Sequence, residues 1–134
     1  YNSVYAALAE PFGALSDRIG RANVMLGGFL LFSLTSLGFV FAGARTLFIL
    51  FALYGLVYAM TEGVGRAFVS DLSSERLRGT ALGAYHTATG FAAIAANLVA
   101  GALWDALGSK ATFAYATSLP LLAATLLLLW QKKR

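Results

Sequence analysis

Charged residues are nearly absent from four long apolar segments of this chain and gather in the short gaps between them. The segment 24–43 holds no charged residue and matches the roughly 20 residues that a helix needs to cross a bilayer core. The segments 47–70, 80–103 and 111–130 are of similar length. A membrane strand needs only about 9–11 residues and alternates strictly, which these segments do not. The sequence therefore predicts an all-α membrane protein.

Composition supports this class and argues against others. Hydrophobic residues make up 59% of the chain and charged residues 12%, whereas soluble domains have about 25% charged residues. The net charge of +4 has no clustered basic face behind it, so no nucleic-acid partner is expected. Without cysteine, and with a lone histidine, the chain offers no metal-ligand pair and no catalytic triad. We expect neither an enzyme nor a metal or other cofactor.

Lysine and arginine residues mark the two sides of the membrane. Seven of them lie in the first gap, the third gap and the tail: Arg18, Arg21, Arg76, Arg78, Lys132, Lys133 and Arg134. The two remaining gaps hold only Arg45 and Lys110. Because cytoplasmic loops carry the excess of positive charge, the side with seven cations should be cytoplasmic. The sequence predicts a multi-pass protein of the plasma (cytoplasmic) membrane with a cytoplasmic C-terminus.

The first gap is a short charged turn, residues 13–21, that follows an apolar stretch at 1–15. Gly13 permits close contact between two helices, and Gly20 permits an unusual backbone angle. Asp17 is placed to accept hydrogen bonds from the first amides of the next helix. On physical grounds alone, this is a solvated tight turn with the usual cytoplasmic arginines.

The spacing within this turn is more specific. It resembles the signature loop of the major facilitator superfamily, found between helices two and three and again between eight and nine, at Gly13, Leu15, Asp17, Arg18, Gly20 and Arg21. Ala22 departs from the motif, which usually has a second basic residue there. The resemblance continues through the chain: residues 62–67, 70–72 and 76–83 are similar to helices ten and eleven, 100–105 to the outer end of helix eleven, and 132–134 to a cytoplasmic C-terminus.

This resemblance implies the C-terminal part of a major facilitator superfamily bundle, with helices eight (partial) to twelve. The chain would form a single unit, 1–134, of four full transmembrane helices and one partial one, at 1–15, 24–43, 47–70, 80–103 and 111–130. Its partners would be the lipid bilayer, the missing N-terminal helices of the same transporter and a small-molecule substrate. The cytoplasmic gate implied by the family consists of Gly13, Asp17, Arg18, Gly20 and Arg21.

The function implied is secondary active transport of a small solute by alternating access, with proton coupling as an option. Two other functions stay open at this point. The chain could be a small non-transporting membrane subunit, held to partners by its glycine faces. It could also be a free-standing four-helix transporter that works as a dimer.

One segment, 47–70, carries polar and charged side chains inside the membrane. Tyr54, Tyr58, Glu62 and Arg66 recur every four residues and so form one stripe along a helix. Charges within a membrane normally face a cavity or a partner, so these four residues are candidates for lining a cavity or for coupling. The spacing allows an ion pair between Glu62 and Arg66, with a structural or gating role; a proton or substrate site is the alternative.

His86, in the segment 80–103, is a further coupling candidate because histidine titrates near neutral pH. The alternative is a hydrogen-bonded histidine that serves only packing.

Overall fold

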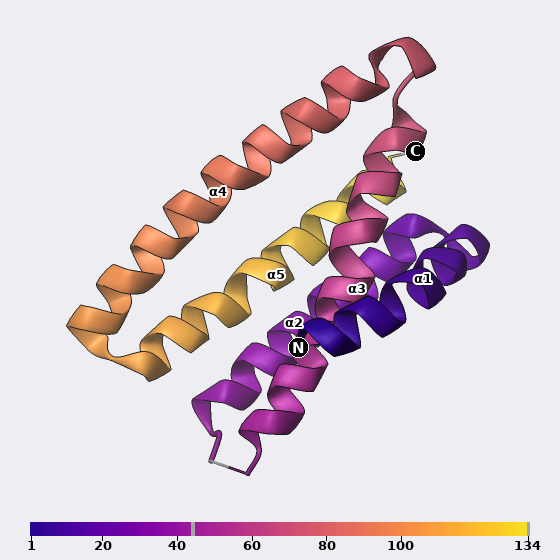
Figure 1. Cartoon of the computed structure of the whole chain (residues 1–134). Helices are drawn as coiled ribbons and strands as arrows, with labels where there is room; N and C mark the ends of the chain where they lie inside the picture. The colour runs from indigo at the N-terminus through magenta and orange to yellow at the C-terminus, as the bar shows by residue number, and fades with distance from the viewer. Residues whose placement is uncertain (44, 134) are drawn as a thin grey trace.

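The computed structural model describes residues 1–43 and 45–133, and within them it contains helices and no strand. In chain order these are α1 (Asn2–Ile19), α2 (Arg21–Val40), α3 (Leu47–Leu72), the short 3₁₀ helix η1 (Glu75–Leu77), α4 (Arg78–Leu107) and α5 (Ser109–Lys132) (Figure 1). Four stretches are long and apolar enough to cross a membrane: Arg21–Val40, Leu47–Leu72, Glu75–Leu107 and Ser109–Lys132. The predicted all-α membrane fold is confirmed.

The helix α2 lies at the centre of the packed part, in contact with α1, α3 and α5. Its buried side chains include Val24 and three hydroxyl residues, Ser33, Thr35 and Ser36. Buried hydroxyls need partners. Thr35 donates to the carbonyl of Leu31 at 2.7 Å, and Ser33 donates across the helix interface to the carbonyl of Thr117 in α5 at 3.0 Å. The bond from Ser33 ties α2 to α5, and small polar residues of this kind let two helices approach closely.

Two connections between helices consist of a single glycine. Gly20 separates α1 from α2 at φ 95°, and Gly108 separates α4 from α5 at φ 82°. A residue with a Cβ adopts these left-handed angles only at a cost in free energy, whereas glycine adopts them readily. Glycine therefore allows the chain to reverse its direction within one residue at both positions. The predicted unusual angle at Gly20 is confirmed.

The helices extend further into the gaps than their apolar segments do. α1 ends at Ile19, rather than near residue 15, and α4 continues to Leu107, rather than 103. Charged side chains at a helix end can reach water without leaving helical geometry. It is therefore glycine, and not charge, that ends these helices.

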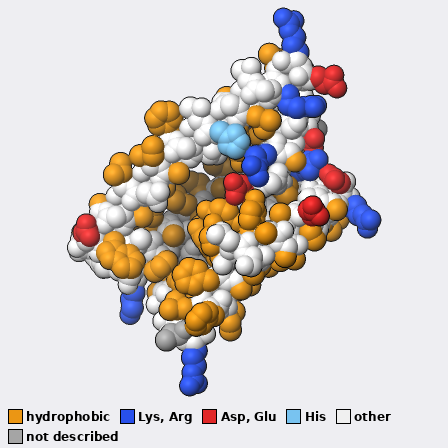
Figure 2. Space-filling model, viewed as in Figure 1, with side chains coloured by type: hydrophobic (Ala, Val, Ile, Leu, Met, Phe, Trp, Pro, Cys, Tyr) orange, Lys and Arg blue, Asp and Glu red, His pale blue; other side chains and the backbone are white. Residues whose placement is uncertain are grey.

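The helix α4 stands apart from the others along most of its length (Figure 1). It has no buried residue, and Phe91, Ile94 and Leu98 are each at least 60% exposed. It touches α3 near its beginning, where Tyr85 lies against Gly65, and α5 near its end, where Thr112 donates to the carbonyl of Ala100 at 3.3 Å. Figure 2 shows a hollow on the face between α4 and the rest of the molecule.

The cation-rich gaps lie at the same end of the bundle. The Gln131 amide at the end of α5 donates to Asn23 Oδ1 at the beginning of α2, at 3.4 Å. The Trp130 ring lies edge-on to Phe68 near the end of α3, with centroids 5.6 Å apart. The beginning of α2 and the ends of α3 and α5 are thus side by side, as the charge pattern requires. Arg134, the last of the seven cations, lies outside the described residues.

Candidate functional site

Arg21 is the centre of a charge cluster at this end of the bundle. Its Nη2 lies 2.9 Å from Oδ1 of Asp17, and its Nε pairs with the Asp71 carboxylate at the end of α3. Its Nη1 donates to the hydroxyl of Ser16 at 3.2 Å. We call these residues (Ser16, Asp17, Arg21 and Asp71) the Arg21 cluster. It ties together the end of α1, the beginning of α2 and the end of α3.

The parts of the Arg21 cluster differ in their exposure. Ser16 is 1% exposed and donates to the Gly13 carbonyl at 2.7 Å, so it offers Arg21 a fixed acceptor. The arginine side chain is 22% exposed, whereas the carboxylates of Asp17 and Asp71 are 61% and 56% exposed. Arginine can hold two carboxylates because its guanidinium presents five donors in a planar fork. The cluster is anchored on the protein side and open to water on the acid side.

The residues predicted to form the gate differ in their contacts: some belong to the Arg21 cluster and others do not. Arg18 is exposed and forms no ion pair within residues 1–43 and 45–133, in contrast to Arg21. Nothing in the described chain lies within 4 Å of a Cβ built at Gly13, so the close helix contact predicted there is not made. Asp17 pairs with Arg21 and not with the first amides of α2. Ala22, where a second base is usual in the motif, is 8% exposed. A charge at that buried position would be unfavourable.

Two members of the Arg21 cluster were missed by sequence reasoning. Asp71 lies just beyond the predicted span 47–70, in the third gap, and its partner Arg21 is 50 residues away in sequence. For Ser16, the sequence offers no indication of a functional contact other than its position inside the signature motif. The available hint for Asp71 was its place near the end of an apolar segment on the cation-rich side, where an acid has arginines to meet.

The two tyrosines of the α3 stripe belong to a larger aromatic group. The rings of Tyr54 and Tyr58 are 5.2 Å apart, and the ring of Tyr1 lies 5.6 and 5.5 Å from them. Tyr5 lies edge-on to Tyr58 at 6.4 Å. We call these four residues the tyrosine cluster: Tyr1 just before α1, Tyr5 in the first turn of α1, and Tyr54 and Tyr58 from α3. Such separations are typical of favourable aromatic pairs.

Close backbone approach between α1 and α3 makes this cluster possible. A Cβ at Gly55 would lie 2.5 Å from the carbonyl oxygen of Tyr1, so only glycine fits there. Ala59, another small residue one turn further along α3, is 1% exposed. One turn beyond Ala59, a Cβ built at Gly63 would have nothing within 4 Å in the described chain, so the close approach does not extend that far.

Glu62 and Arg66, the charged half of the α3 stripe, have no partners in the described chain comparable to those of the two tyrosines. Glu62 and Arg66 are both exposed, and the two ion pairs found in the described chain both involve Arg21. The predicted pair between Glu62 and Arg66 is thus not formed, although four residues separate them. An i,i+4 pair on a helix contributes only about 0.2–0.5 kcal/mol, so the spacing alone does little to hold the two side chains together. Both charges are left available to other groups.

His86 lies on α4, exposed, with its ring 5.4 Å from the ring of its neighbour Tyr85. It makes no hydrogen bond or ion pair with Glu62 or Arg66 among the described residues. The hydroxyl of Tyr85 lies 2.8 Å from the position of a Cβ at Gly65, which places this part of α4 beside the charged half of the stripe. The structure thus brings α4 against this part of α3 through Tyr85 and Gly65, and no contact among the described residues joins His86 to Glu62 or Arg66.

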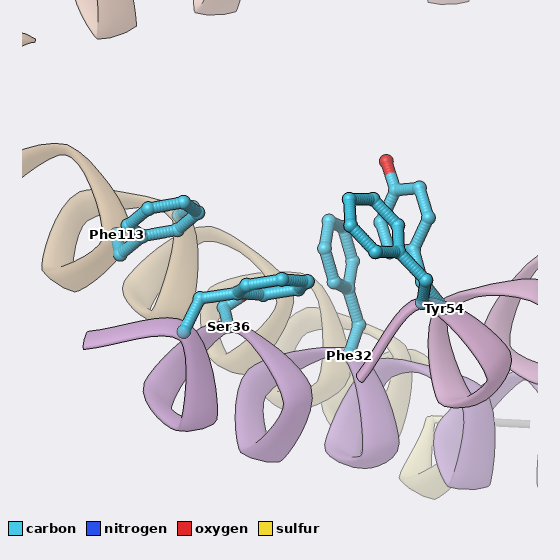
Figure 3. A pocket seen from close by; sticks show the side chains of 7 residues that line it. Phe32, Ser36, Tyr54 and Phe113 are labelled. Carbon is cyan, nitrogen blue, oxygen red and sulfur yellow. The ribbon is translucent and has the colours of Figure 1, made fainter. Parts of the chain in front are cut away.

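A cavity of about 340 Å³ adjoins the tyrosine cluster. Figure 3 shows side chains from three helices gathered around it: Phe32 and Ser36 from α2, Tyr54 from α3 and Phe113 from α5. Phe39, Phe51 and Ala116 complete the lining. Tyr54 belongs to both groups, and its ring lies 5.7 Å from that of Phe32. We call this space the aromatic cavity. It was not anticipated, because its residues come from three separate segments with no shared motif.

Comparison with known proteins agrees with this architecture. The sequence model of the family described as Major Facilitator Superfamily matches residues 1–134. The chain is 45% identical over 129 residues to an uncharacterized MFS-type transporter of Methanocaldococcus jannaschii, an alignment that covers 96% of this chain and 32% of that protein. The chain therefore spans about a third of the length of this relative. No solved structure matches. These matches do not favour the membrane-subunit or four-helix dimer alternatives.

Proposed function

This chain belongs to the major facilitator superfamily, and we propose that it is part of a secondary transporter that moves a small solute by alternating access. In such transporters two helical bundles rock around a site near the membrane midplane. The remaining helices of the transporter, which would lie upstream, complete the cavity and are the partner that this half requires. The similarity to a relative about three times as long supports this proposal.

The Arg21 cluster is the observation that carries the proposal. It joins three helices at one end of the bundle through pairs whose carboxylates are more than half exposed. Solvated ion pairs of this kind are worth about 0.2–1 kcal/mol each, so they can form and break during a transport cycle. This weak, solvated cluster is suited to a gate at this end of the bundle, which the missing helices of the transporter would complete. We assign this end to the cytoplasm, with the C-terminus on the same side, in the plasma membrane.

A cysteine at position 63 tests alternating access directly. Gly63 lies on α3 beside Glu62, and nothing within 4 Å obstructs a side chain there. In the full-length transporter, with other cysteines replaced, Gly63→Cys should react with a membrane-impermeant thiol reagent from either side of the membrane. Adding Arg21→Gln should raise the rate from the cytoplasmic side and lower it from the outside. Reaction from a single side would contradict alternating access, and unchanged rates in the double variant would contradict the gate.

The orientation is tested by the same chemistry at the helix ends. Cysteines introduced in place of Arg18 and Lys132 should be labelled from the cytoplasm, and cysteines in place of Arg45 and Lys110 from outside. Labelling of positions 18 and 132 from opposite sides would overturn the topology on which the gate assignment rests.

Proton coupling is the finer part of the proposal. Glu62 and His86 are titratable groups on α3 and α4 without ion-pair partners in the described chain, and unpaired intramembrane groups are candidates for proton relays. In proteoliposomes with an imposed pH gradient, Glu62→Gln should abolish gradient-driven accumulation but leave solute exchange at equal pH. His86→Gln should have the smaller effect. A Glu62→Gln variant that keeps the full pH dependence would exclude the carboxylate as the proton carrier.

A further inference from the structure

The last turn of α5 contacts both α2 and α3 at the level of the Arg21 cluster. The Nε2 of Gln131 donates to Oδ1 of Asn23, in the first turn of α2, at 3.4 Å. The ring of Trp130 lies edge-on to that of Phe68, near the end of α3, with centroids 5.6 Å apart. The end of α5 is therefore attached to two of the three helices that the cluster joins.

These contacts and the Arg21 cluster border the same space. A cavity of about 350 Å³ is lined by Arg21 and Asp71 of the cluster, together with Asn23, Phe68 and Gln131. The last turn of α5 thus belongs to the immediate surroundings of the cluster.

Asn23 uses both ends of its amide to connect helices. Its Nδ2 donates at 2.7 Å to the carbonyl of Ile19, the last residue of α1. The last carbonyls of a helix have no partner within that helix, so this bond from α2 satisfies one of them. Its Oδ1 accepts the bond from Gln131. One side chain therefore links the end of α1, the beginning of α2 and the end of α5.

The bond from Asn23 to Ile19 spans the break on which the position of Arg21 depends. Arg21 is the first residue of α2 and directly follows Gly20, whose φ of 95° sets the direction of α2 relative to α1. Its partner Asp17 lies on α1, so a change in that direction separates the two charges. A hydrogen bond across the same break restrains the direction that the ion pair needs.

We propose that Asn23 and Gln131 are positioning residues of the gate, and that the last turn of α5 thereby takes part in closing it. Gln131 orients the Asn23 amide, and Asn23 restrains the turn that keeps Arg21 beside Asp17. Neither residue lies within the signature motif at 13–22. The inference rests on the proposed function, because it names a further part of the same gate.

Labelling of a cysteine at position 63 in the full-length transporter tests this role. In the Gly63→Cys background, Asn23→Ala and Gln131→Met should each raise the labelling rate from the cytoplasmic side about threefold, as expected for one neutral hydrogen bond, and lower the rate from outside. Alanine and methionine are good helix formers, so both variants should fold. Leu129→Met is the matched control, since it places the same side chain two residues away, and it should leave both rates unchanged.

Unchanged rates in Asn23→Ala and Gln131→Met would overturn the proposal. A shift in Leu129→Met equal to that in Gln131→Met would also overturn it, because the end of α5 would then act by packing alone. So would a lower thermal midpoint in Asn23→Ala and Gln131→Met with an unchanged ratio of the two labelling rates, which is the result expected of residues that only stabilise the fold.

Combined variants test whether these residues act through Arg21. Asn23→Ala should add no further shift in the Arg21→Gln background, and Gln131→Met should add none in the Asn23→Ala background. Additive shifts would contradict the order of action proposed here, in which Gln131 acts on Asn23 and Asn23 on Arg21.

The same measurements separate this inference from the proposed function. Reaction of Gly63→Cys from one side only would contradict alternating access, and the role of α5 with it. Reaction from both sides that shifts in Arg21→Gln, but not in Asn23→Ala or Gln131→Met, would support the transporter and its gate and overturn the role of α5 alone.

Discussion

Two acid–arginine pairs with the same spacing behave differently in this molecule. Asp17 and Arg21 are four residues apart and form an ion pair, whereas Glu62 and Arg66, also four apart, do not. The first pair bridges the break at Gly20 and is supported by Ser16 and Asp71. The second lies on one continuous helix with no third partner. Spacing brings two charges within reach, but a neighbouring helix decides whether they are held.

The largest effect should come from the backbone that shapes the first pair. Gly20→Ala forces a side chain into a left-handed angle that costs about 1–3 kcal/mol, and it tilts Arg21 away from Asp17. Thermal unfolding of the full-length protein in detergent should show a clearly lower midpoint. Gly13→Ala is the control, since it sits within α1 with open space around it. That variant should be neutral or slightly stabilising; equal losses would mean that the angle at Gly20 is unimportant.

Removal of the shared cation should rank second. Arg21→Gln leaves Asp17 and Asp71 without their partner and Ser16 with one fewer, for a loss of about 1–2 kcal/mol after allowance for solvent screening. The loss should shrink in high salt, because exposed pairs are screened. A midpoint shift that is the same in 50 mM and 1 M salt would argue that Arg21 acts by packing.

Loss of one acid should be smaller again. Asp71→Asn should cost about 0.5–1 kcal/mol, since the pair with Asp17 remains. Its effect should disappear in the Arg21→Gln background, which a double-mutant cycle measures. Additive losses in the cycle would show that Asp71 stabilises α3 by some other contact.

The second pair should contribute nothing comparable. Arg66→Gln is expected to change the free energy of unfolding by less than about 0.5 kcal/mol, as for other substitutions of unpartnered exposed residues. The same measurement as for Arg21→Gln gives the comparison. A loss as large as that in Arg21→Gln would mean that Glu62 and Arg66 do pair in the complete transporter.

The helical architecture was readable from the sequence because it depends on local quantities. Uncharged runs such as 24–43 gave the spans, and the glycine within the signature motif gave the break at Gly20. Even there, the helix ends were placed several residues short. Hydropathy falls where charges begin, but the helical backbone ends only where glycine allows it to turn.

The candidate site was readable only in part, because its contacts join distant segments. The α3 stripe was identified from its period of four residues, but nothing in that pattern indicated that Tyr1 and Tyr5 would pack against it. Asp71 could not be matched to Arg21 without knowing that the end of α3 lies beside the beginning of α2. The predicted pair of Glu62 and Arg66 is not formed for a related reason: the spacing is right, but no third group in the described chain holds the two side chains together.

The one-residue link at Gly108 also has a consequence for biosynthesis. α5 begins at Ser109, immediately after the link, so no loop separates the two spans. At about 5–20 residues per second, the ribosome completes the 24 residues of α5 in roughly one to five seconds after α4. Because α4 has no buried residue in the described chain, we expect it to leave the translocon together with α5, as one arm of a hairpin. On this expectation, α5 would contribute to the orientation of α4 in the bilayer as much as the sequence of α4 itself.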